Sequence, residues 1–215
     1  MPRQASGTYA GASAEQRRAD RERRMRDAAL ELLGTIGWEN TTVRRICAAA
    51  RTSPMFFYES FDDLPDLVRS VYGEISATLA IRAVEAITDA PYNLTDQSRA
   101  AARVYIEAAT EDPRIGRLMF SDAPPLRELR TSLLGGLSTL IAQQARVVGV
   151  SGNHDDVLQA TTLLVAAGAG ELVLAWLDDR LPLTRESLIE LVAQVLSSLA
   201  TSMPEIPPDL DSVSR

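Results

Sequence analysis

The stretch from residue 41 to residue 61, TTVRRICAAARTSPMFFYESF, constrains the fold more than any other part of the chain. Its first half carries apolar residues at the i, i+3, i+4 and i+7 spacing that places them on one face of a helix. These residues are Val43, Ile46, Cys47 and Ala50. Thr41 or Thr42 precedes them with a hydroxyl that can cap the free amides of a first turn. The pattern predicts a short amphipathic helix that begins after one of these threonines.

A second helix start follows within a few residues. Ser53 suits the N-cap, and Pro54 suits the first helical position, because an amide there would have no partner. Phe57 and Phe61, four residues apart, then face the first helix. Two short helices joined by so tight a turn predict a helix-turn-helix, whose second helix can enter a DNA major groove.

The same stretch resembles the DNA-binding domain of the TetR family of transcriptional repressors. The residues that match the family's usual run in order and spacing are Thr42, Ser53, Phe57, Tyr58, Phe61 and Leu67. The match covers about residues 28–67, and beyond it only length and helix count agree. The resemblance implies an all-α fold of about nine helices, with a three-helix helix-turn-helix DNA-binding domain and a larger helical ligand-binding and dimerisation domain.

Several residues depart from the family pattern. Arg51 stands where glycine is common, at a turn position that would cost another residue about 1 kcal/mol or more if it is left-handed. Ser60 replaces a histidine or tyrosine, and Leu64 a lysine, that approach phosphates in the family. The same edge is made acidic by Glu59, Asp62 and Asp63. These changes leave the fold intact but weaken the usual phosphate clamp.

The domain boundaries follow from composition and periodicity. Residues 1–14 are small and polar without a period and are expected to form a disordered arm. We expect the DNA-binding domain at residues 15–62, the ligand-binding and dimerisation domain at residues 63–203, and a flexible proline-rich tail at residues 204–215. Further helices are expected over residues 15–36, 63–88, 95–110, 113–120, 124–150, 155–179 and 185–199. The pair Gly135 and Gly136 inside one of them predicts a kink or a close approach, by a ligand or by another helix.

Charge is divided unevenly along the chain, whose net charge is −7. Residues 1–61 hold ten arginines against seven acidic residues, whereas the remaining 154 residues hold twelve against twenty-two. A basic front on an acidic body indicates one nucleic-acid face. All the basic residues are arginines, which bind phosphate and guanine through two parallel hydrogen bonds.

The residues expected to contact double-stranded operator DNA are Arg17, Arg18, Arg21, Thr42, Arg44, Arg45, Ser53, Pro54, Met55, Phe56 and Tyr58. The first-helix arginines are expected at phosphates or the minor groove, although they also fit a solvated helix face. The apolar run 54–56 is expected at thymine methyl groups, with packing against a neighbouring element as the alternative. Hydrogen-bonded base readout falls to Arg44 and Arg45. The resemblance assigns phosphate contacts to Thr42 and Tyr58.

The resemblance also implies a homodimer and an unknown small-molecule effector. The last two helices are expected to form the dimer interface through Leu163, Ala167, Gly170, Leu174, Leu188, Leu191, Val192, Val195 and Leu199. The candidate ligand-pocket residues are Tyr72, Tyr105, Met119, Phe120 and Trp176, each of which also fits plain core. A two-fold dimer is required because one short helix reads too few base pairs.

The sequence gives little support for a disulfide, a membrane span, a metal site or a catalytic site. Cys47 is the only cysteine, which excludes an internal disulfide and favours a cytoplasmic location. The sequence has no apolar run long enough for a membrane span and no apolar segment of a secretory signal at its start. His154 is the only histidine, so neither a histidine-based metal site nor a histidine-dependent triad is expected. We expect no cofactor and no catalysis.

These observations favour a DNA-binding transcriptional regulator, a repressor released from a palindromic operator by a small molecule. The alternative is a dimeric ligand-binding or interaction module that has lost specific DNA binding, as the acidic edge suggests. A third reading, an α-helical enzyme, needs a site that the sequence does not reveal.

Overall fold

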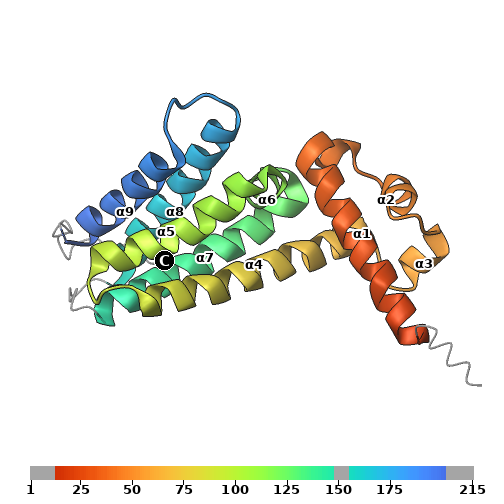
Figure 1. Cartoon of the computed structure of the whole chain (residues 1–215), viewed down its shortest axis with the longest axis horizontal. Coiled ribbons are helices and arrows are strands. Elements are labelled where there is room, and N and C mark those ends of the chain that lie inside the picture. Colours follow the sequence, from red (N-terminus) through yellow and green to blue (C-terminus); the bar gives the residue numbers. More distant parts are fainter. Residues whose placement is uncertain (1–12, 148–154, 202–215) are drawn as a thin grey trace, which may run out of the picture. The chain divides into compact units, whose positions relative to one another are not determined.

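The computed structural model describes residues 13–147 and 155–201. These residues form nine α-helices and one short 3-10 helix, with no strand among them (Figure 1). The predicted all-α fold is therefore confirmed. The expected tail lies outside the described residues, as does the expected arm except for Ser13 and Ala14, which begin the first helix instead.

The chain divides into two compact units, residues 1–71 and residues 72–215. The sequence predicted a division after residue 62, whereas these units meet inside the fourth helix, α4 (Leu64–Asp89). Leu67 and Val68, on the first turns of α4, are fully buried and belong to the first unit.

The first unit begins with α1 (Ala14–Ile36), which starts one residue before the predicted start and ends at the predicted residue. The Ser13 hydroxyl accepts from the Gln16 amide at 3.0 Å, and the Gln16 side chain accepts in return from the Ser13 amide at 2.7 Å. This reciprocal pair satisfies two amides that the helix itself cannot bond. Gly37, with a φ of 76°, ends the helix as predicted.

A short 3-10 helix, η1 (Trp38–Asn40), leads to α2 (Val43–Ala49) and α3 (Pro54–Tyr58). Both α2 and α3 pack against α1. The side chains of Met25, Ile46 and Phe57 are completely buried in this unit. Cys47 is also buried, as a free thiol whose pKa is raised by burial.

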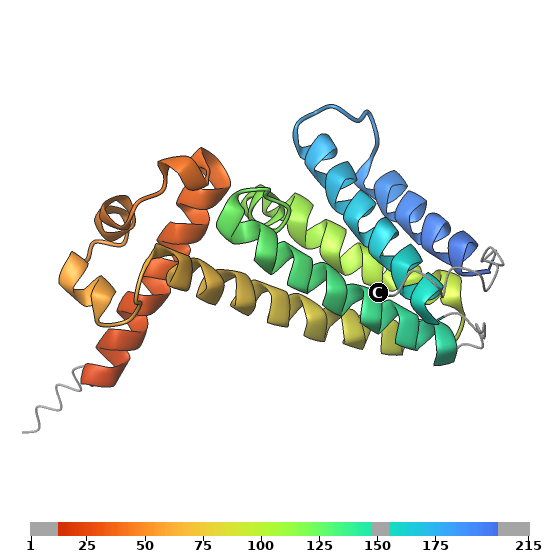
Figure 2. The same ribbon diagram turned by 180° about the vertical axis from the view of Figure 1, so that it is seen from behind.

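The second unit contains the rest of α4 and five further helices (Figure 2). They are α5 (Leu94–Glu111), α6 (Pro113–Met119), α7 (Pro124–Val147), α8 (Asp155–Leu177) and α9 (Arg185–Thr201). Helix α5 packs along α9, and α7 packs along α8. The main core cluster draws on α5, α8 and α9 and consists of Ala102, Ile106, Ala109, Val165, Val173, Leu188, Ile189, Val192 and Leu196.

Glycines let two helices of this unit approach their neighbours closely. A Cβ on Gly116 would lie 2.8 Å from Leu177 Cδ1 and 2.9 Å from the Ala109 carbonyl oxygen. In contrast, a Cβ on Gly135 or Gly136 would meet nothing within 4 Å, so the described residues provide no close approach there. In the part of the chain that the structure describes, no helix is both long and apolar enough to cross a membrane.

Candidate nucleic-acid interface

The turn between α2 and α3 is set by backbone hydrogen bonds at the end of α2. The Thr42 hydroxyl caps the start of α2 by accepting from the Arg45 amide at 3.2 Å. At its end, the Thr52 amide donates to the Cys47 carbonyl at 2.9 Å and the Arg51 amide donates to the Ala48 carbonyl at 3.2 Å. This bond pair is a Schellman motif, which needs a left-handed residue directly after the end of the helix. Arg51 is that residue, with a φ of 51°.

Helix α3 starts where the Ser53-Pro54 signal predicted, with Pro54 at its first position and no side-chain cap from Ser53. Phe57 is fully buried, and its ring lies 5.7 Å from that of Phe61. Because these rings hold α3 against the unit's core, the opposite side of the short helix faces outward. Met55 and Tyr58 are 63% and 61% exposed on that side.

The apolar run at the start of α3 is divided. Pro54 and Met55 are exposed, but Phe56 is half-buried beneath Arg21, whose guanidinium carbon lies 4.3 Å from the ring centroid. The stacked pair joins α1 to α3 by a cation–π contact. Phe56 therefore packs against a neighbouring element, which was the alternative given for this run. Pro54 and Met55 are exposed instead.

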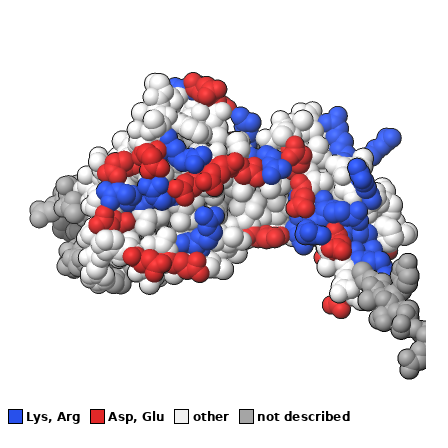
Figure 3. Space-filling view, viewed as in Figure 1, with Lys and Arg blue, Asp and Glu red and all other residues white. Residues whose placement is uncertain are grey.

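The predicted arginines lie on α1 and α2. Arg17 and Arg18 are exposed, and Arg18 pairs with Glu22 at 2.8 Å and donates to the Glu59 carbonyl at 3.3 Å. Arg44 is exposed, whereas the guanidinium of Arg45 donates to the Asn40 carbonyl at 3.0 Å. Blue basic atoms gather over the first unit in Figure 3. Arg44 is thus the better placed of the two α2 arginines to reach a partner.

Near the acidic edge of this unit, the carboxylates of Glu22 and Asp63 are held by internal contacts. The Ser60 hydroxyl and the Arg18 guanidinium both hydrogen-bond to Glu22; burial raises the pKa of that carboxyl, but these bonds outweigh burial and lower it overall. Asp63 caps α4 by accepting from the Asp66 amide at 2.7 Å. Since its carboxylate satisfies the helix start, the end of α4 that would otherwise attract a phosphate is already neutralised.

The candidate ligand-pocket residues divide differently from the prediction. A cavity in the second unit is lined by Tyr105 and Phe120, together with apolar residues of α4, α5, α7, α8 and α9. Tyr72 and Met119 are buried and bonded to each other, the Tyr72 hydroxyl donating to the Met119 carbonyl at 3.2 Å. Trp176 packs on the core, and its ring nitrogen donates to the Leu183 carbonyl at 2.8 Å. None of these three residues is among the described residues that line the cavity.

Most residues that line this cavity were not among the predicted pocket residues. They include small and aliphatic residues such as Ala83, Ile87, Ala102, Leu134, Ala166 and Ala169. The small-residue run at the centre of α8, AAGAGE, was their one visible signal in the sequence. Small side chains line a cavity because they leave space between helix backbones that larger ones would fill.

The residues of the expected dimer face differ in their exposure. Leu188 and Gly170 are buried within the second unit itself, and Val192 is 6% exposed but lines the apolar groove between α8 and α9. Leu163, Leu191 and Val195 are exposed by 43%, 39% and 39%, and the unpredicted Leu164 by 69%. Ala167 is exposed and Leu174 half-buried, whereas the side chain of Leu199 lies outside those described. An apolar groove of about 390 Å³ runs between α8 and α9 beside these residues.

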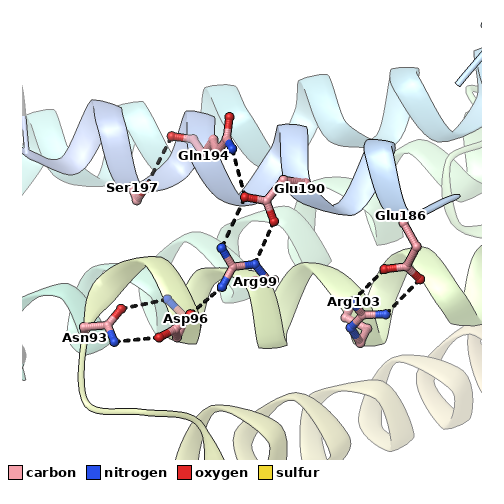
Figure 4. Close-up of polar contacts among 8 residues, drawn as sticks. All are labelled: Asn93, Asp96, Arg99, Arg103, Glu186, Glu190, Gln194 and Ser197. Atoms are coloured by element: carbon pink, nitrogen blue, oxygen red, sulfur yellow. Dashed lines mark hydrogen bonds and ion pairs between the residues drawn. The ribbon is translucent and has the colours of Figure 1, made fainter. Parts of the chain in front are cut away.

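Ion pairs join α5 to α9 on another side of the second unit (Figure 4). Arg99 donates two hydrogen bonds of 2.7 and 3.2 Å to the Glu190 carboxylate and also forms an ion pair with Asp96. Arg103 grips Glu186 through two bonds of 3.1 and 2.8 Å. We call these five residues the α5–α9 ladder. Hydrogen bonds from Arg99 and Gln194 lower the pKa of Glu190 to about 2.

The helix-turn-helix, with an exposed outer side on its second helix and arginines beside it, defines a protein of the DNA-binding class. Comparison with known proteins shows which family this domain resembles. Residues 26–71 match the family model described as bacterial regulatory proteins, tetR family. The match covers the helix-turn-helix unit, and the likeness to solved structures extends the shared fold to most of the chain.

Solved structures share the fold along most of the chain. The fatty acid degradation regulator FadR from Bacillus halodurans is 16% identical with a TM-score of 0.70, covering 82% of this chain and 94% of its own. FadR from Bacillus subtilis, in complex with stearoyl-CoA, is 16% identical with a TM-score of 0.67, covering 84% and 97%. A TetR-family regulator from Streptomyces coelicolor is 14% identical with a TM-score of 0.62, covering 89% and 96%. No curated protein matches the sequence.

Proposed function

We propose that this chain is a dimeric repressor that binds a palindromic DNA operator and is released from it by a small molecule. The observation that carries the proposal is the outer side of α3, where Met55 and Tyr58 are more than half exposed, together with exposed Arg44 on the preceding helix α2. A methionine thioether and a tyrosine ring without cover suit the apolar and hydrogen-bonding groups of a major-groove edge.

Phosphate contacts in this proposal come from arginine instead of the usual clamp. Ser60 is bonded to Glu22 and Asp63 caps α4, so neither position offers a group for a phosphate. Exposed Arg17 and Arg44 supply positive charge on the same unit, and the Thr42 and Tyr58 hydroxyls are exposed as well. Arginine contacts to phosphate release counterions, so the binding constant should fall steeply with salt.

The α8–α9 groove supports the dimer. Its walls are apolar, and they include the exposed side chains of Leu164, Leu191 and Val195. A second copy that lays its own α8 and α9 on this face would remove these side chains from water through a self-complementary contact. Two reading helices would then meet half-sites about one DNA turn apart.

Release by a ligand requires a site whose occupation favours one arrangement of the dimer over another. The cavity of the second unit supplies a site, because its wall includes residues of α8 and α9, the helices that carry the groove. The complex of Bacillus subtilis FadR with stearoyl-CoA is an example of a small molecule bound to a protein of this fold.

Selection from random duplex DNA with the full-length chain tests the proposal. We expect the selected fragments to share a palindrome, and binding followed by fluorescence anisotropy to weaken steeply as salt rises. A reporter promoter that carries the selected site should then be repressed.

Replacing the readout arginine sharpens this test. We expect Arg44→Ala to weaken binding about 5- to 150-fold and to relax the base preference at one position of each half-site, because a base contact is lost. Arg82→Ala removes an exposed arginine of the second unit and serves as the matched control that leaves affinity unchanged. Failure to select any sequence, with no salt-dependent binding, would favour the alternative of a dimeric module without specific DNA binding.

A further inference from the structure

The cavity of the second unit carries information about its ligand. It has a volume of about 70 Å³, and its wall is formed by side chains of α4, α5, α7, α8 and α9 together with Phe120. Among the described residues that line it, Tyr105 alone carries a polar side-chain group, its hydroxyl.

That hydroxyl is buried and has no hydrogen-bond partner among the described residues. Burial raises the pKa of Tyr105 to about 12, so the group keeps its proton at neutral pH and remains a hydrogen-bond donor. A buried donor without an acceptor is unfavourable, and an acceptor brought in by a ligand would remove that penalty. By contrast, the hydroxyl of Tyr72 in the same unit already has its carbonyl acceptor.

None of the described residues that line the cavity is charged. A cation beside it is Arg130 of α7, which lines an adjoining cleft with Phe120 and Gly170. Its guanidinium is bonded to the Phe120 carbonyl at 3.3 Å and paired with Asp122 at 2.8 Å and Glu171 at 3.8 Å. Because two carboxylates already neutralise Arg130, a ligand carboxylate or phosphate would be buried without a counter-charge, which is strongly unfavourable.

The size of the cavity limits the ligand as well. An engineered apolar cavity of about 150 Å³ accommodates benzene, so a cavity of about half that volume takes a compact molecule only. Phe120 closes one side by lying against Gly170, where a Cβ would come within 2.5 Å of its ring. A ligand as large as a small ring must therefore displace wall residues of α7 or α8.

We propose that this cavity binds a compact, uncharged and largely apolar molecule with one hydrogen-bond acceptor, which the Tyr105 hydroxyl engages. The inference rests on the proposed function, in which ligand binding releases the protein from DNA, and it names the class of ligand for that same site. An acyl-CoA is therefore not expected as the ligand, because the described residues at the cavity offer its phosphates no unpaired cation.

Two probes of matched shape test the inference on the full-length chain without DNA. Cyclopentanone and methylenecyclopentane have the same ring and number of heavy atoms, and only the ketone has a strong acceptor. Dissociation constants are measured by NMR titration for the wild type and for Tyr105→Phe. We expect the substitution to raise the dissociation constant of cyclopentanone about fivefold and to leave that of methylenecyclopentane unchanged, because only the ketone loses a hydrogen bond. For each probe, the free energy of its hydration and of widening the cavity is the same in both proteins. These contributions therefore cancel when the dissociation constants of wild type and variant are compared.

Tyr72→Phe is the control, because it removes a hydroxyl that is already bonded outside the cavity, and it should alter neither probe. Cyclopentanecarboxylate and stearoyl-CoA should not bind measurably. The inference is overturned if Tyr105→Phe affects both probes alike, if neither neutral probe binds up to its solubility, or if a charged probe binds more tightly. Since no DNA is present, failure here leaves the DNA-binding proposal standing, and failure to select an operator leaves the ligand class standing.

Discussion

At the scale of single residues, Arg51 holds a backbone conformation that its side chain disfavours. Its φ of 51° lies in the left-handed region, where the Cβ of an L-residue approaches the next carbonyl oxygen at a cost of about 1–2 kcal/mol. The two backbone bonds that end α2 hold it there. The turn of the helix-turn-helix is therefore kept by hydrogen bonding against a local preference.

Glycine at this position should relieve the strain. We expect Arg51→Gly to raise the free energy of unfolding by about 1 kcal/mol, since the gain in the folded turn exceeds the added freedom of the unfolded chain. Arg44→Gly, inside right-handed α2, is the matched control and should lower it by about 1 kcal/mol. Urea titrations followed by circular dichroism measure both, and equal signs for the two variants would contradict the interpretation.

The two buried tyrosines of the second unit predict opposite responses to loss of a hydroxyl. Tyr105→Phe removes a buried group that has no partner among the described residues, so the free protein should gain about 1 kcal/mol of stability. Tyr72→Phe deprives the Met119 carbonyl of its donor and should lose about 1 kcal/mol. Thermal unfolding of the two single variants without ligand checks the signs, and a loss of stability in Tyr105→Phe would show that its hydroxyl is already satisfied.

At the scale of elements, the α5–α9 ladder fixes one helix of the groove against a helix of the cavity wall. Arg99 and Arg103 are one turn apart on α5, as Glu186 and Glu190 are on α9, so the side chains meet in two parallel rungs (Figure 4). Each rung is a two-bond arginine–carboxylate pair, which restricts sliding of α9 along α5. The ladder is thus placed to hold the register of α9, which lines the groove, against α5, which lines the cavity.

The ladder also predicts how stability depends on pH. The pKa of Glu190 is lowered to about 2 in the folded protein from an ordinary 4.5. A lowered carboxyl pKa contributes stability that is present above the unfolded value and is lost as pH falls from about 4.5 toward 2. We therefore expect Glu190→Gln to lower the melting temperature most above about pH 5, and the difference from wild type to shrink toward pH 2.

The control for this experiment is Glu85→Gln, which changes an exposed carboxylate of α4 that has no ion pair within the described part of the chain. Its melting temperature should follow the wild type at every pH. A difference between Glu190→Gln and wild type that grows as pH falls would have the wrong sign for a carboxylate held by Arg99.

At the scale of the whole molecule, the exposed apolar side chains of α8 and α9 are gathered along one groove. Leu164 is 69% exposed, and Gly168, one turn later, leaves open space where a side chain would stand. Large apolar side chains that gather along a groove typically mark a surface for another protein chain. A second copy that covers this groove would give the two reading helices a fixed separation.

A charge in the groove should therefore separate the subunits. We expect Leu164→Glu to weaken dimerisation by on the order of 100-fold, because a carboxylate would be buried without a partner, and to abolish tight binding to a palindrome. Ile81→Glu, on a residue of α4 that is 61% exposed outside the groove, should leave both unchanged. Sedimentation equilibrium gives the association constants, and a wild-type dimer in Leu164→Glu would place the interface elsewhere.

Local signals in the sequence were enough to predict the helices and the helix-turn-helix. Thr42 caps α2 and Pro54 begins α3 as predicted, although Ser53 makes no side-chain cap. Caps and turns depend on atoms within a few residues, so the sequence contains all the partners that they need. The outward side of α3 followed in the same way from the spacing of Phe57 and Phe61.

The division of apolar residues between core, cavity and groove was less predictable. Helix α8 is apolar on several sides, so its periodicity does not separate Val165, which is core, from Leu164, which is exposed. The same ambiguity on α9 does not separate Leu188, which is fully buried, from Leu191, which is 39% exposed. Which side is internal depends on where α5 and α7 lie, and those helices are distant in sequence.

The helices, the turn and the basic front were thus legible from the order of residues, because caps, short-range periodicity and charge act over a few neighbours. The stacking of Arg21 on Phe56, the bonded state of Tyr72 against the unbonded state of Tyr105, and the ladder from Arg99 to Glu190 were decided by packing. Each joins or separates groups tens of residues apart, and their contacts exist only after helices have been placed side by side.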